Sequence, residues 1–428
     1  MLVPDGEERL WAFTETAYPP TITDVVPEMV YHVMGHGHSN ASFIIGNTSV
    51  ILIDALDTDA RGARLAEIIA GYTDKPVKTI IYTHGHPDHR GGAGAFAATD
   101  PEVIAFAPAR PLLDRTEQIN GILDRRGTRQ FGYTLSDEDA ISQGIGPREG
   151  IAVGDGVRAF LPPTTVYRDP EVHRTIDGVA LQLRATPGEA EDQCCIWLDD
   201  HKVLFCGDTY YGCWPNLYAI RGGQYRDIAG WIASLDLLRT YPADALLPGH
   251  TRPILGREAV TDVLTTFRDA LDYVLTETLA CMERGLGLEE TAATVTLPPR
   301  YRDLPYLQEF YGTVAWSVRG IYTGYLGWFD GNPTHLNPLS PRAFADRMVA
   351  QMGGTAAVEI AIAAANAAGD YQWALELVDL LLALDPDATA VKQAKATALA
   401  GLGRQETSAN GRHYYLACAR EILAGDPA

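Results

Sequence analysis

The sequence Thr-His-Gly-His-Pro-Asp-His, which begins at Thr83, constrains what this chain can fold into more than any other feature. It follows an apolar run over residues 77–82 that predicts a buried strand. In extended chain, His84 and His86 project to the same side and can bind one metal ion. Two further side chains come a turn later and can bind a second ion nearby; they are Asp88 and His89. Imidazole and carboxylate groups suit zinc, manganese or iron, so the segment predicts a metal site at the end of this strand.

Three further candidate ligands follow other predicted strands; they are Glu189, Asp208 and His250. A glycine stands immediately before each of them, and glycine lets the backbone bend tightly toward a metal. Taken singly, such a residue is an ordinary cap or turn residue. Together and in this order, the three predict partners for the ligands at 84–89.

The first part of the chain alternates short β-branched runs with turns and amphipathic stretches, which indicates an α/β fold with helices outside the sheets. From about residue 262, helical periodicity dominates. We therefore expect a catalytic domain over residues 1–261 and a helical domain over 262–428, with a tetratricopeptide-like helix pair within it. The predicted strands are residues 42–46, 49–54, 77–82, 103–106, 179–184, 195–198 and 203–206, and the first predicted helix is 60–72.

The charge of the chain disfavours a nucleic-acid substrate. The sequence has 34 basic and 55 acidic residues, a net charge of −21, and no basic stripe. No apolar run reaches the roughly 18 residues that span a membrane, and the start of the chain does not resemble a signal peptide. The six cysteines lack zinc-knuckle spacing and predict buried, reduced thiols. We expect a cytoplasmic protein without a membrane span.

The order of these motifs, HxHxDH, then TPG with a ligand, then GD, then GH, resembles the metallo-β-lactamase fold, an αββα sandwich. The resemblance implies two divalent metal ions, for which zinc is the expected identity. It assigns the first ion to His84, His86 and Glu189, and the second to Asp88, His89 and His250, with Asp208 bridging both. The first ion usually has a histidine where Glu189 stands, and Glu191 is an alternative to Glu189 for this role.

With a glutamate after TPG, the sequence resembles the alkyl sulfatases within that superfamily. The likeness continues in five segments outside the ligands: residues 35–44, 216–222, 310–319, 324–334 and 408–416. It implies a hydrolase that cleaves alkyl sulfate monoesters to an alcohol and inorganic sulfate through a metal-bound hydroxide, and a homodimer formed through the helical domain. The carried-over catalytic residues are Asp88 and Asp208, and the carried-over substrate-binding residues are Asn216, Tyr218 and Arg221.

Three features depart from the alkyl sulfatase pattern. The family has glutamate where this chain has Asp208, and an aromatic residue where it has Arg90. A third, sterol-carrier-like domain, credited in the family with gathering aliphatic chains, has no counterpart in these 428 residues. We therefore expect short or medium alkyl chains. Residues 310–329 hold seven aromatic side chains, which fit either a packed core or a wall for such a chain.

Two other functions remain open at this point. The same site could act on another ester, such as a lactone, β-lactam, thioester or phosphodiester, because chemistry on this fold follows the pocket. Alternatively, the chain could be a non-catalytic protein whose helical half binds partners. The sequence does not decide between cleavage of the carbon–oxygen and the sulfur–oxygen bond.

Overall fold

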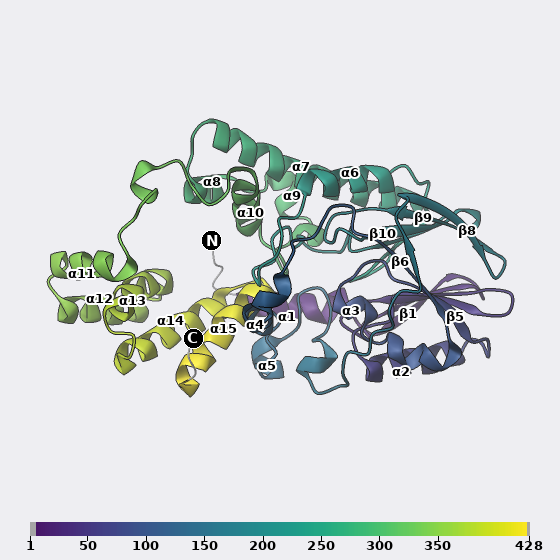
Figure 1. Cartoon of the computed structure of the whole chain (residues 1–428), viewed down its shortest axis with the longest axis horizontal. Coiled ribbons are helices and arrows are strands. Elements are labelled where there is room, and N and C mark those ends of the chain that lie inside the picture. The colour runs from purple at the N-terminus through teal and green to yellow at the C-terminus, as the bar shows by residue number, and fades with distance from the viewer. Residues whose placement is uncertain (1–5, 426–428) are drawn as a thin grey trace. The chain divides into compact units, whose positions relative to one another are not determined.

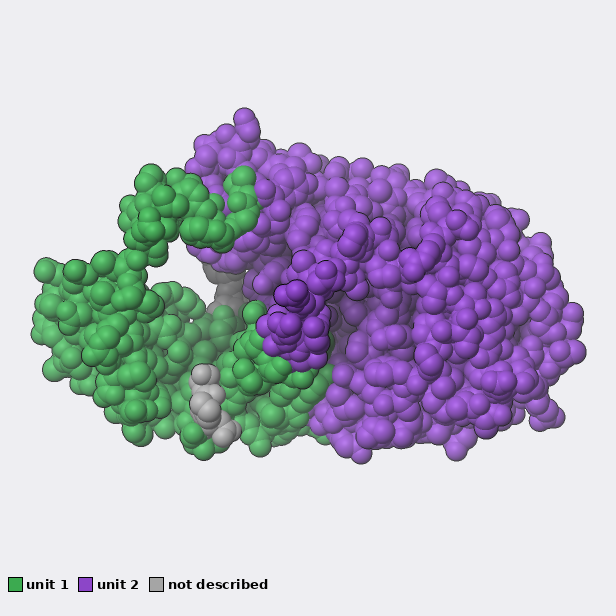
Figure 2. Space-filling model, in the orientation of Figure 1, with its two compact units in different colours: residues 1–11, 121–141, 326–428 green, residues 12–120, 142–325 purple. Residues whose placement is uncertain are grey.

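The computed structural model describes residues 6–425 (Figure 1). The chain divides into two compact units, which Figure 2 colours separately. The sandwich unit contains residues 12–120 and 142–325, and the helical unit contains residues 1–11, 121–141 and 326–428. The domain division expected after residue 261 falls inside helix α7 (Arg257–Glu283) and stays a prediction.

Two mixed sheets form the centre of the sandwich unit. One has seven strands in the order β1-β2-β3-β4-β5-β6-β7, and the other has six in the order β13-β12-β11-β10-β9-β8. The strands of the first sheet are β1 (Thr21–Val26), β2 (Val30–Met34), β3 (Ala41–Ile45), β4 (Val50–Ile53), β5 (Val77–Ile81), β6 (Glu102–Phe106) and β7 (Thr165–Tyr167). Those of the second are β8 (Glu171–Ile176), β9 (Val179–Ala185), β10 (Cys194–Leu198), β11 (Val203–Gly207), β12 (Ala245–Pro248) and β13 (Ile254–Leu255).

Branched aliphatic side chains from both sheets fill the space between them. Ile51 and Ile81 of the first sheet belong to the same buried cluster as Leu183 and Phe205 of the second. Side chains alternate across a strand, so the other face of the first sheet needs its own cover. Helix α2 (Asp59–Ala70) belongs to the cluster on that face. Two facing sheets with a helix on the outer face of the first agree with the sandwich architecture expected from the sequence.

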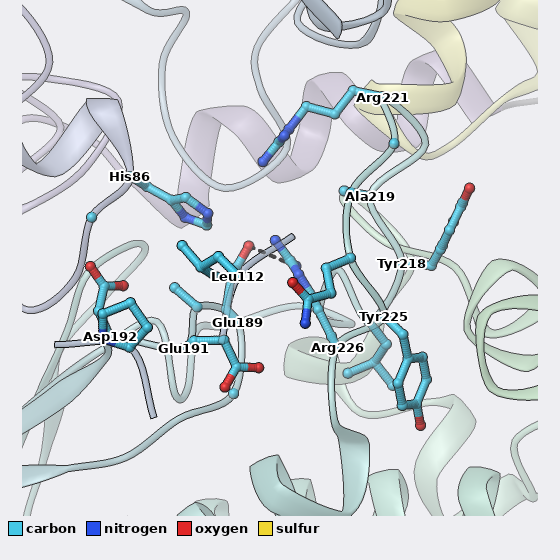
Figure 3. Close-up of a pocket in the computed structure, with 18 residues that line it drawn as sticks. His86, Leu112, Glu189, Glu191, Asp192, Tyr218, Ala219, Arg221, Tyr225 and Arg226 are labelled. Atoms are coloured by element: carbon cyan, nitrogen blue, oxygen red, sulfur yellow. Dashed lines mark hydrogen bonds and ion pairs between the residues drawn. The ribbon is translucent and has the colours of Figure 1, made fainter. Parts of the chain in front are cut away.

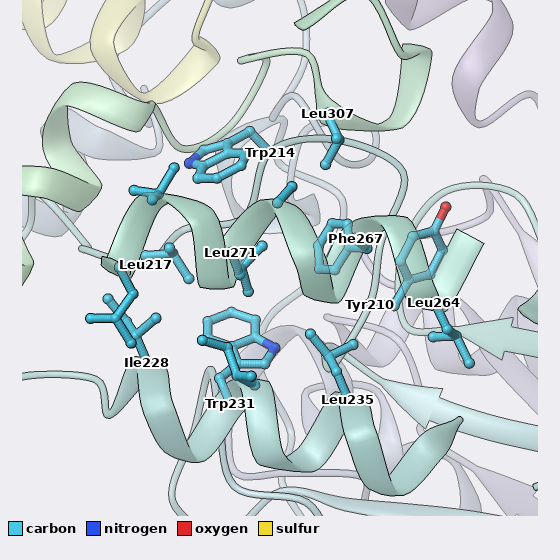
Figure 4. Packing of buried hydrophobic residues seen from close by; sticks show 14 of the residues in the cluster. Tyr210, Trp214, Leu217, Ile228, Trp231, Leu235, Leu264, Phe267, Leu271 and Leu307 are labelled. Carbon is cyan, nitrogen blue, oxygen red and sulfur yellow. The ribbon is translucent and has the colours of Figure 1, made fainter. Parts of the chain in front are cut away.

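Helices α6 (Ile228–Leu238) and α7 cover the outer face of the second sheet (Figure 4). Trp231 of α6 is fully buried, and its indole N–H donates to the backbone oxygen of Thr209 at 2.9 Å. A side chain at Gly188 would lie 2.8 Å from the Trp231 ring, so only glycine lets the backbone pack this closely. This core thus holds the backbone beside two candidate ligands, Glu189 and Asp208.

The strand ends that carry the predicted ligands meet at one edge. Strand β5 runs parallel to β4, and β11 runs parallel to β12, so their carboxyl ends share an edge within each sheet. The two edges touch each other: a side chain at Gly207, which has a φ of 49°, would lie 2.8 Å from Cβ of Thr83. His84 and Asp208 are the next residues in sequence after Thr83 and Gly207.

The helical unit ends in a series of packed helices. Helices α13 (Tyr371–Leu384) and α14 (Thr389–Gln405) are joined by a short turn at Asp385, as the tetratricopeptide-like pattern predicts. The other long helices of this unit are α4 (Asn120–Gln130), α11 (Pro341–Gln351), α12 (Thr355–Ala368) and α15 (Ala409–Ala424). Residues 121–141 join it through long-range contacts: the ring nitrogens of His413 lie 3.0 Å and 2.8 Å from the backbone oxygens of Gln130 and Ala140.

The six cysteines, all among the described residues, are free, as expected. Over residues 6–425, no single helix combines the length and apolar composition of a membrane span, and only the bent pair α11 and α12 meets the criteria jointly.

A buried histidine in β2 makes stability depend on pH. His32 is 1% exposed, and its Nδ1 lies 2.8 Å from Oγ of Ser42. Burial lowers the pKa of His32 from 6.5 to about 3. Between these two values the unfolded chain binds a proton that the folded chain does not. His32 therefore removes stability as the pH falls from about 6.5 toward about 3.

We predict that His32→Gln flattens this dependence. The measurement is made with a chelator present to remove bound metal. As the pH falls, the free energy of unfolding of the unmodified protein should decrease by about 1.4 kcal/mol more per pH unit than that of the variant. Urea unfolding of both proteins across the range from about pH 6 to about pH 4 measures the difference. Parallel falls in the two proteins would contradict the prediction.

Candidate metal centre

Asp208 lies at the centre of the predicted ligands. Its Oδ2 is 3.7 Å from Nε2 of His84, 3.5 Å from Nε2 of His89 and 3.3 Å from Nε2 of His250. Oδ2 of Asp88 is also 3.3 Å from Nε2 of both His89 and His250. Residues that are more than 160 positions apart in sequence therefore converge at the shared edge of the two sheets.

The donor atoms fall into two principal groups. His84, His86 and Asp208 form one, and His89, Asp208 and His250 form the other, with donor atoms within 4.8 Å of one another in each. Asp208 belongs to both groups, which is the position that a bridging carboxylate needs. A third group joins Asp88 and His250 to His38, which the sequence analysis missed.

The chemistry of these groups fits divalent metal ions. Nε2 of His84 lies 2.9 Å from Nδ1 of His86, and the Nε2 atoms of His89 and His250 lie 3.3 Å apart. Imidazole nitrogens point at one another in this way when their lone pairs are directed at a common ion. Among the described residues, Oδ1 of Asp208 and Oε2 of Glu189 are buried without a hydrogen-bond partner. A metal ion would satisfy such atoms.

Hydrogen bonds behind the ligands orient the histidine rings. Oδ2 of Asp54 lies 2.8 Å from Nδ1 of His89, and the same carboxylate accepts hydrogen bonds from the backbone and hydroxyl of Thr83. Nδ1 of His250 lies 3.0 Å from the backbone oxygen of His38. Each contact turns the Nε2 atom of its ring toward Asp208, as such outer partners do in metal sites. Asp54 was not identified from sequence, although its place directly after β4 was a usable signal.

Buried carboxylates control the protonation of two of these histidines. Burial alone would lower the pKa of His250, but the facing carboxylates of Asp208 and Asp88 raise it to about 9. The pKa of His89 is likewise raised well above its usual value, against the effect of burial, by Asp208, Asp88 and Asp54. In the metal-free protein these rings hold protons that a coordinating ion must displace.

In the group formed by His84, His86 and Asp208, the pKa of His86 is shifted in the opposite direction. Burial lowers the pKa of His86 well below its usual value, and the positive charges of Arg226 and Arg221 lower it further. His86 is therefore neutral and ready to coordinate. Both guanidinium groups lie close enough to His86 to act on it.

The structure separates the two glutamates that the sequence left as alternatives. Glu189 is 6% exposed; its Oε1 accepts a hydrogen bond from Nη1 of Arg226 at 3.0 Å, and burial raises its pKa to about 7. Glu191 is instead engaged by Arg110, whose Nε donates to both carboxylate oxygens at 3.1 Å. Glu189 interacts electrostatically with Asp208 and His250. Glu189 is thus the better placed of the two as a ligand.

A pocket of about 410 Å³ opens beside this centre (Figure 3). His86 and Glu189 contribute to its wall, together with two of the predicted substrate-binding residues, Tyr218 and Arg221. The third, Asn216, is buried and is not among the lining residues. Its backbone oxygen accepts a hydrogen bond from Arg226, which does line the pocket and which the sequence analysis missed.

Other candidates from the sequence lie elsewhere. Arg90 stacks over the rings of Tyr82 and Phe160, and Arg319 pairs with the exposed Glu289. None of the seven aromatic residues between 310 and 329 lines the pocket among the described residues. Of the two interpretations of that span, a packed core fits Phe310, Tyr311 and Tyr322, which are buried.

Comparison with known proteins identifies the family. The metallo-beta-lactamase superfamily profile matches residues 34–250, and the alkyl sulfatase dimerisation profile matches residues 288–425. A linear primary-alkylsulfatase of Pseudomonas sp. (strain ATCC 19151) is 38% identical over 394 residues, which cover 89% of this chain and 74% of that protein. The chain belongs to the alkyl sulfatase family. It is thus an enzyme of the metal-dependent sulfuric ester hydrolase class.

Two further relatives agree with this membership. An alkyl/aryl-sulfatase of Saccharomyces cerevisiae is 32% identical, over 94% of this chain and 64% of that protein. The solved structure of the stereoselective inverting sec-alkylsulfatase Pisa1 from Pseudomonas sp. has a TM-score of 0.86 and 28% identity, over 99% of this chain and 68% of that one. The chain therefore spans about two thirds to three quarters of the length of these relatives.

We predict that the two glutamates differ in metal binding. Glu189→Gln should weaken binding of zinc by roughly 100-fold or more, because loss of an outer-shell partner alone costs about 10- to 100-fold. Glu191→Gln, the matched control two residues away, should keep the affinity within about threefold. Competition with a chromogenic chelator measures both. The opposite order would make Glu191 the ligand.

Proposed function

We propose that this enzyme hydrolyses alkyl sulfate monoesters to an alcohol and inorganic sulfate at a centre of two divalent metal ions, with zinc as the expected metal. The observation that carries the proposal is a pair of arginines on one pocket wall beside the candidate ligands. Arg221 and Arg226 both line the pocket, and both act on the pKa of His86. Such a pair provides a positive site inside a chain whose net charge is −21.

A sulfate monoester matches these groups in charge and geometry. It carries one negative charge spread over three terminal oxygens. A guanidinium group offers parallel N–H donors to two oxygens of such an anion. Arg221 supplies these donors in our proposal, while Arg226 is tied to Glu189 and sets the position of that carboxylate. Tyr218 and Asn216 belong to the same segment and complete the proposed substrate-binding set.

The ligands divide between two positions in this proposal. His84, His86 and Glu189 would hold the first ion, and Asp88, His89 and His250 the second, with Asp208 shared. The close donor groups that support this division are His84, His86 and Asp208, and His89, Asp208 and His250; Glu189 is assigned from its burial and its charge interactions with Asp208 and His250. When bound, such a pair of ions would lower the pKa of a coordinated water toward about 7. Asp88 and Asp208 are the carboxylates of the proposed catalytic set, and Oδ2 of each lies 3.3 Å from Nε2 of His250. Asp54 keeps the His89 ring in one orientation through its 2.8 Å contact.

The alternatives fit the pocket less well. Lactones, β-lactams and thioesters need not carry an anionic group that would engage two arginines at the reaction centre. The acidic surface opposes a nucleic-acid phosphodiester. A purely partner-binding role does not explain why the candidate metal ligands converge.

The C-terminal part of the chain suggests how two copies associate. Because the alkyl sulfatase dimerisation profile matches residues 288–425, we propose a homodimer formed through this part of the chain. The cytoplasmic location stays a prediction.

A hydrolysis screen of the zinc-loaded protein tests the proposed activity. We expect release of sulfate from n-alkyl sulfates, and no comparable turnover of lactones, β-lactams or phosphodiesters. Reaction in ¹⁸O-labelled water shows which bond breaks, because the label enters the alcohol on carbon–oxygen cleavage and the sulfate on sulfur–oxygen cleavage. Absence of sulfate release from every alkyl sulfate would refute the proposal.

We also predict that Arg221→Ala selectively weakens recognition of the sulfate group. Loss of charge-assisted hydrogen bonds should raise the inhibition constant of an n-alkyl sulfonate by roughly 30- to 100-fold. The inhibition constant of the alcohol with the same chain should change by less than about threefold. Arg319→Ala, which removes an arginine outside the pocket, is the control and should alter neither value. Equal losses for sulfonate and alcohol would mean that Arg221 is structural.

A further inference from the structure

A short loop after β6 carries an exposed leucine into the pocket. Residues 107–113 follow the end of β6 and reach the pocket wall, where Pro108 and Leu112 are lining residues (Figure 3). Leu112 is 59% exposed, and the adjacent Leu113 is 62% exposed but does not line the pocket. The two leucines therefore have similar exposure and different surroundings.

An ion pair fixes this loop to Glu191, which also lines the pocket. Nε of Arg110 donates to both carboxylate oxygens of Glu191 at 3.1 Å, and Nη1 lies 3.6 Å from Oδ2 of Asp227. The backbone N–H of Ala109 also donates to the backbone oxygen of Glu191 at 2.8 Å. We call the pair Arg110–Glu191 the loop clamp. Glu191 thus has a defined contact that is separate from metal binding.

A second contact holds the loop at Pro111, directly before Leu112. Nε2 of Gln224 donates to the backbone oxygen of Pro111 at 3.2 Å. Gln224 lies in the same segment as Arg221 and Arg226, and all three line the pocket. The three residues directly before Leu112 are therefore tied to the segments that carry Glu191 and the arginines.

The pocket lining combines charged and apolar side chains. The charged ones are Glu189, Glu191, Asp192, Arg221 and Arg226, and the apolar contribution comes from Pro108, Leu112, Leu217, Ala219 and Tyr225. A ligand with a charged head and an aliphatic tail matches this arrangement. Each methylene that leaves water strengthens binding by about fourfold. A leucine that is largely exposed without a ligand can be covered by such a tail.

We propose that Leu112 is a specificity-determining residue that contacts the alkyl chain of the substrate, and that the loop clamp positions it. The inference deepens the proposed sulfatase function and rests on it. Arg110 and Glu191 are positioning residues, because they act through the loop.

Kinetics and binding over a chain-length series test the role of Leu112. We compare Leu112→Ala with the matched control Leu113→Ala on n-alkyl sulfates of two to twelve carbons, and measure dissociation constants of n-alkyl sulfonates by calorimetry. For Leu112→Ala, the loss in kcat/KM should grow from about twofold at two carbons to about tenfold at eight. The loss should reside in KM and in the sulfonate dissociation constant. Leu113→Ala should stay within about twofold of the unmodified protein at every length.

The loop clamp is tested in the same series. Arg110→Ala and Glu191→Ala should each reproduce the length-dependent loss, with unchanged zinc content. Combined with Leu112→Ala, neither should add more than about twofold, because the clamp acts through this leucine. Thermal unfolding and zinc content identify any variant that misfolds, and Arg110→Lys, which retains a cation, then replaces Arg110→Ala.

The outcomes separate this inference from the function on which it rests. If the unmodified protein neither hydrolyses alkyl sulfates nor binds the sulfonates, the proposed function fails. If it hydrolyses them but Leu112→Ala matches Leu113→Ala at every length, only the role of Leu112 is overturned. An equal loss at all chain lengths would also overturn it, because a tail contact must depend on the tail.

Discussion

The close approach of Thr83 and Gly207 is the contact on which the site depends. Gly207 ends β11 and Thr83 lies two residues beyond the end of β5, and a side chain at Gly207 would lie 2.8 Å from Cβ of Thr83. The backbone N–H of Cys194 donates to the backbone oxygen of Thr83 at 2.8 Å, which adds a direct link between the sheets. His84 and Asp208 come next in sequence, so the spacing of the sheets sets the distance between them. Metal binding is thus built on the packing of two hydrophobic layers.

Electrostatics divides the centre into two halves. Carboxylates surround His89 and His250 and favour their protonated forms, whereas Arg221 and Arg226 act on His86 in the opposite sense. The arginines also make the pocket attractive to an anion within a strongly acidic chain. Ligand binding and substrate recognition therefore use the same local charges. A change at Arg226 affects both, because this residue donates to Glu189 and lines the pocket.

Much of the sandwich unit was predictable from sequence, because many of its strands are short apolar runs. The runs at 77–82 and 203–206 match β5 (Val77–Ile81) and β11 (Val203–Gly207) closely. Asp54 and Arg226 were missed, since an aspartate after a strand or an arginine in a loop is common and becomes informative only through its partner. The choice between Glu189 and Glu191 needed the position of Arg110, which is 81 residues away from Glu191. Local patterns locate the strand ends, and long-range contacts assign the side chains.

The helical unit is assembled from three separate stretches of chain, residues 1–11, 121–141 and 326–428. During synthesis from the N-terminus, the first two stretches leave the ribosome long before the third. Buried contacts such as that between Gln130 and His413 span 283 positions and form only when the last helix has been made. Residues 121–141 must therefore wait for much of translation without their final neighbours. A recombinant fragment cut after residue 325 would leave them permanently in that condition, so its boundaries need to exclude or replace this insertion.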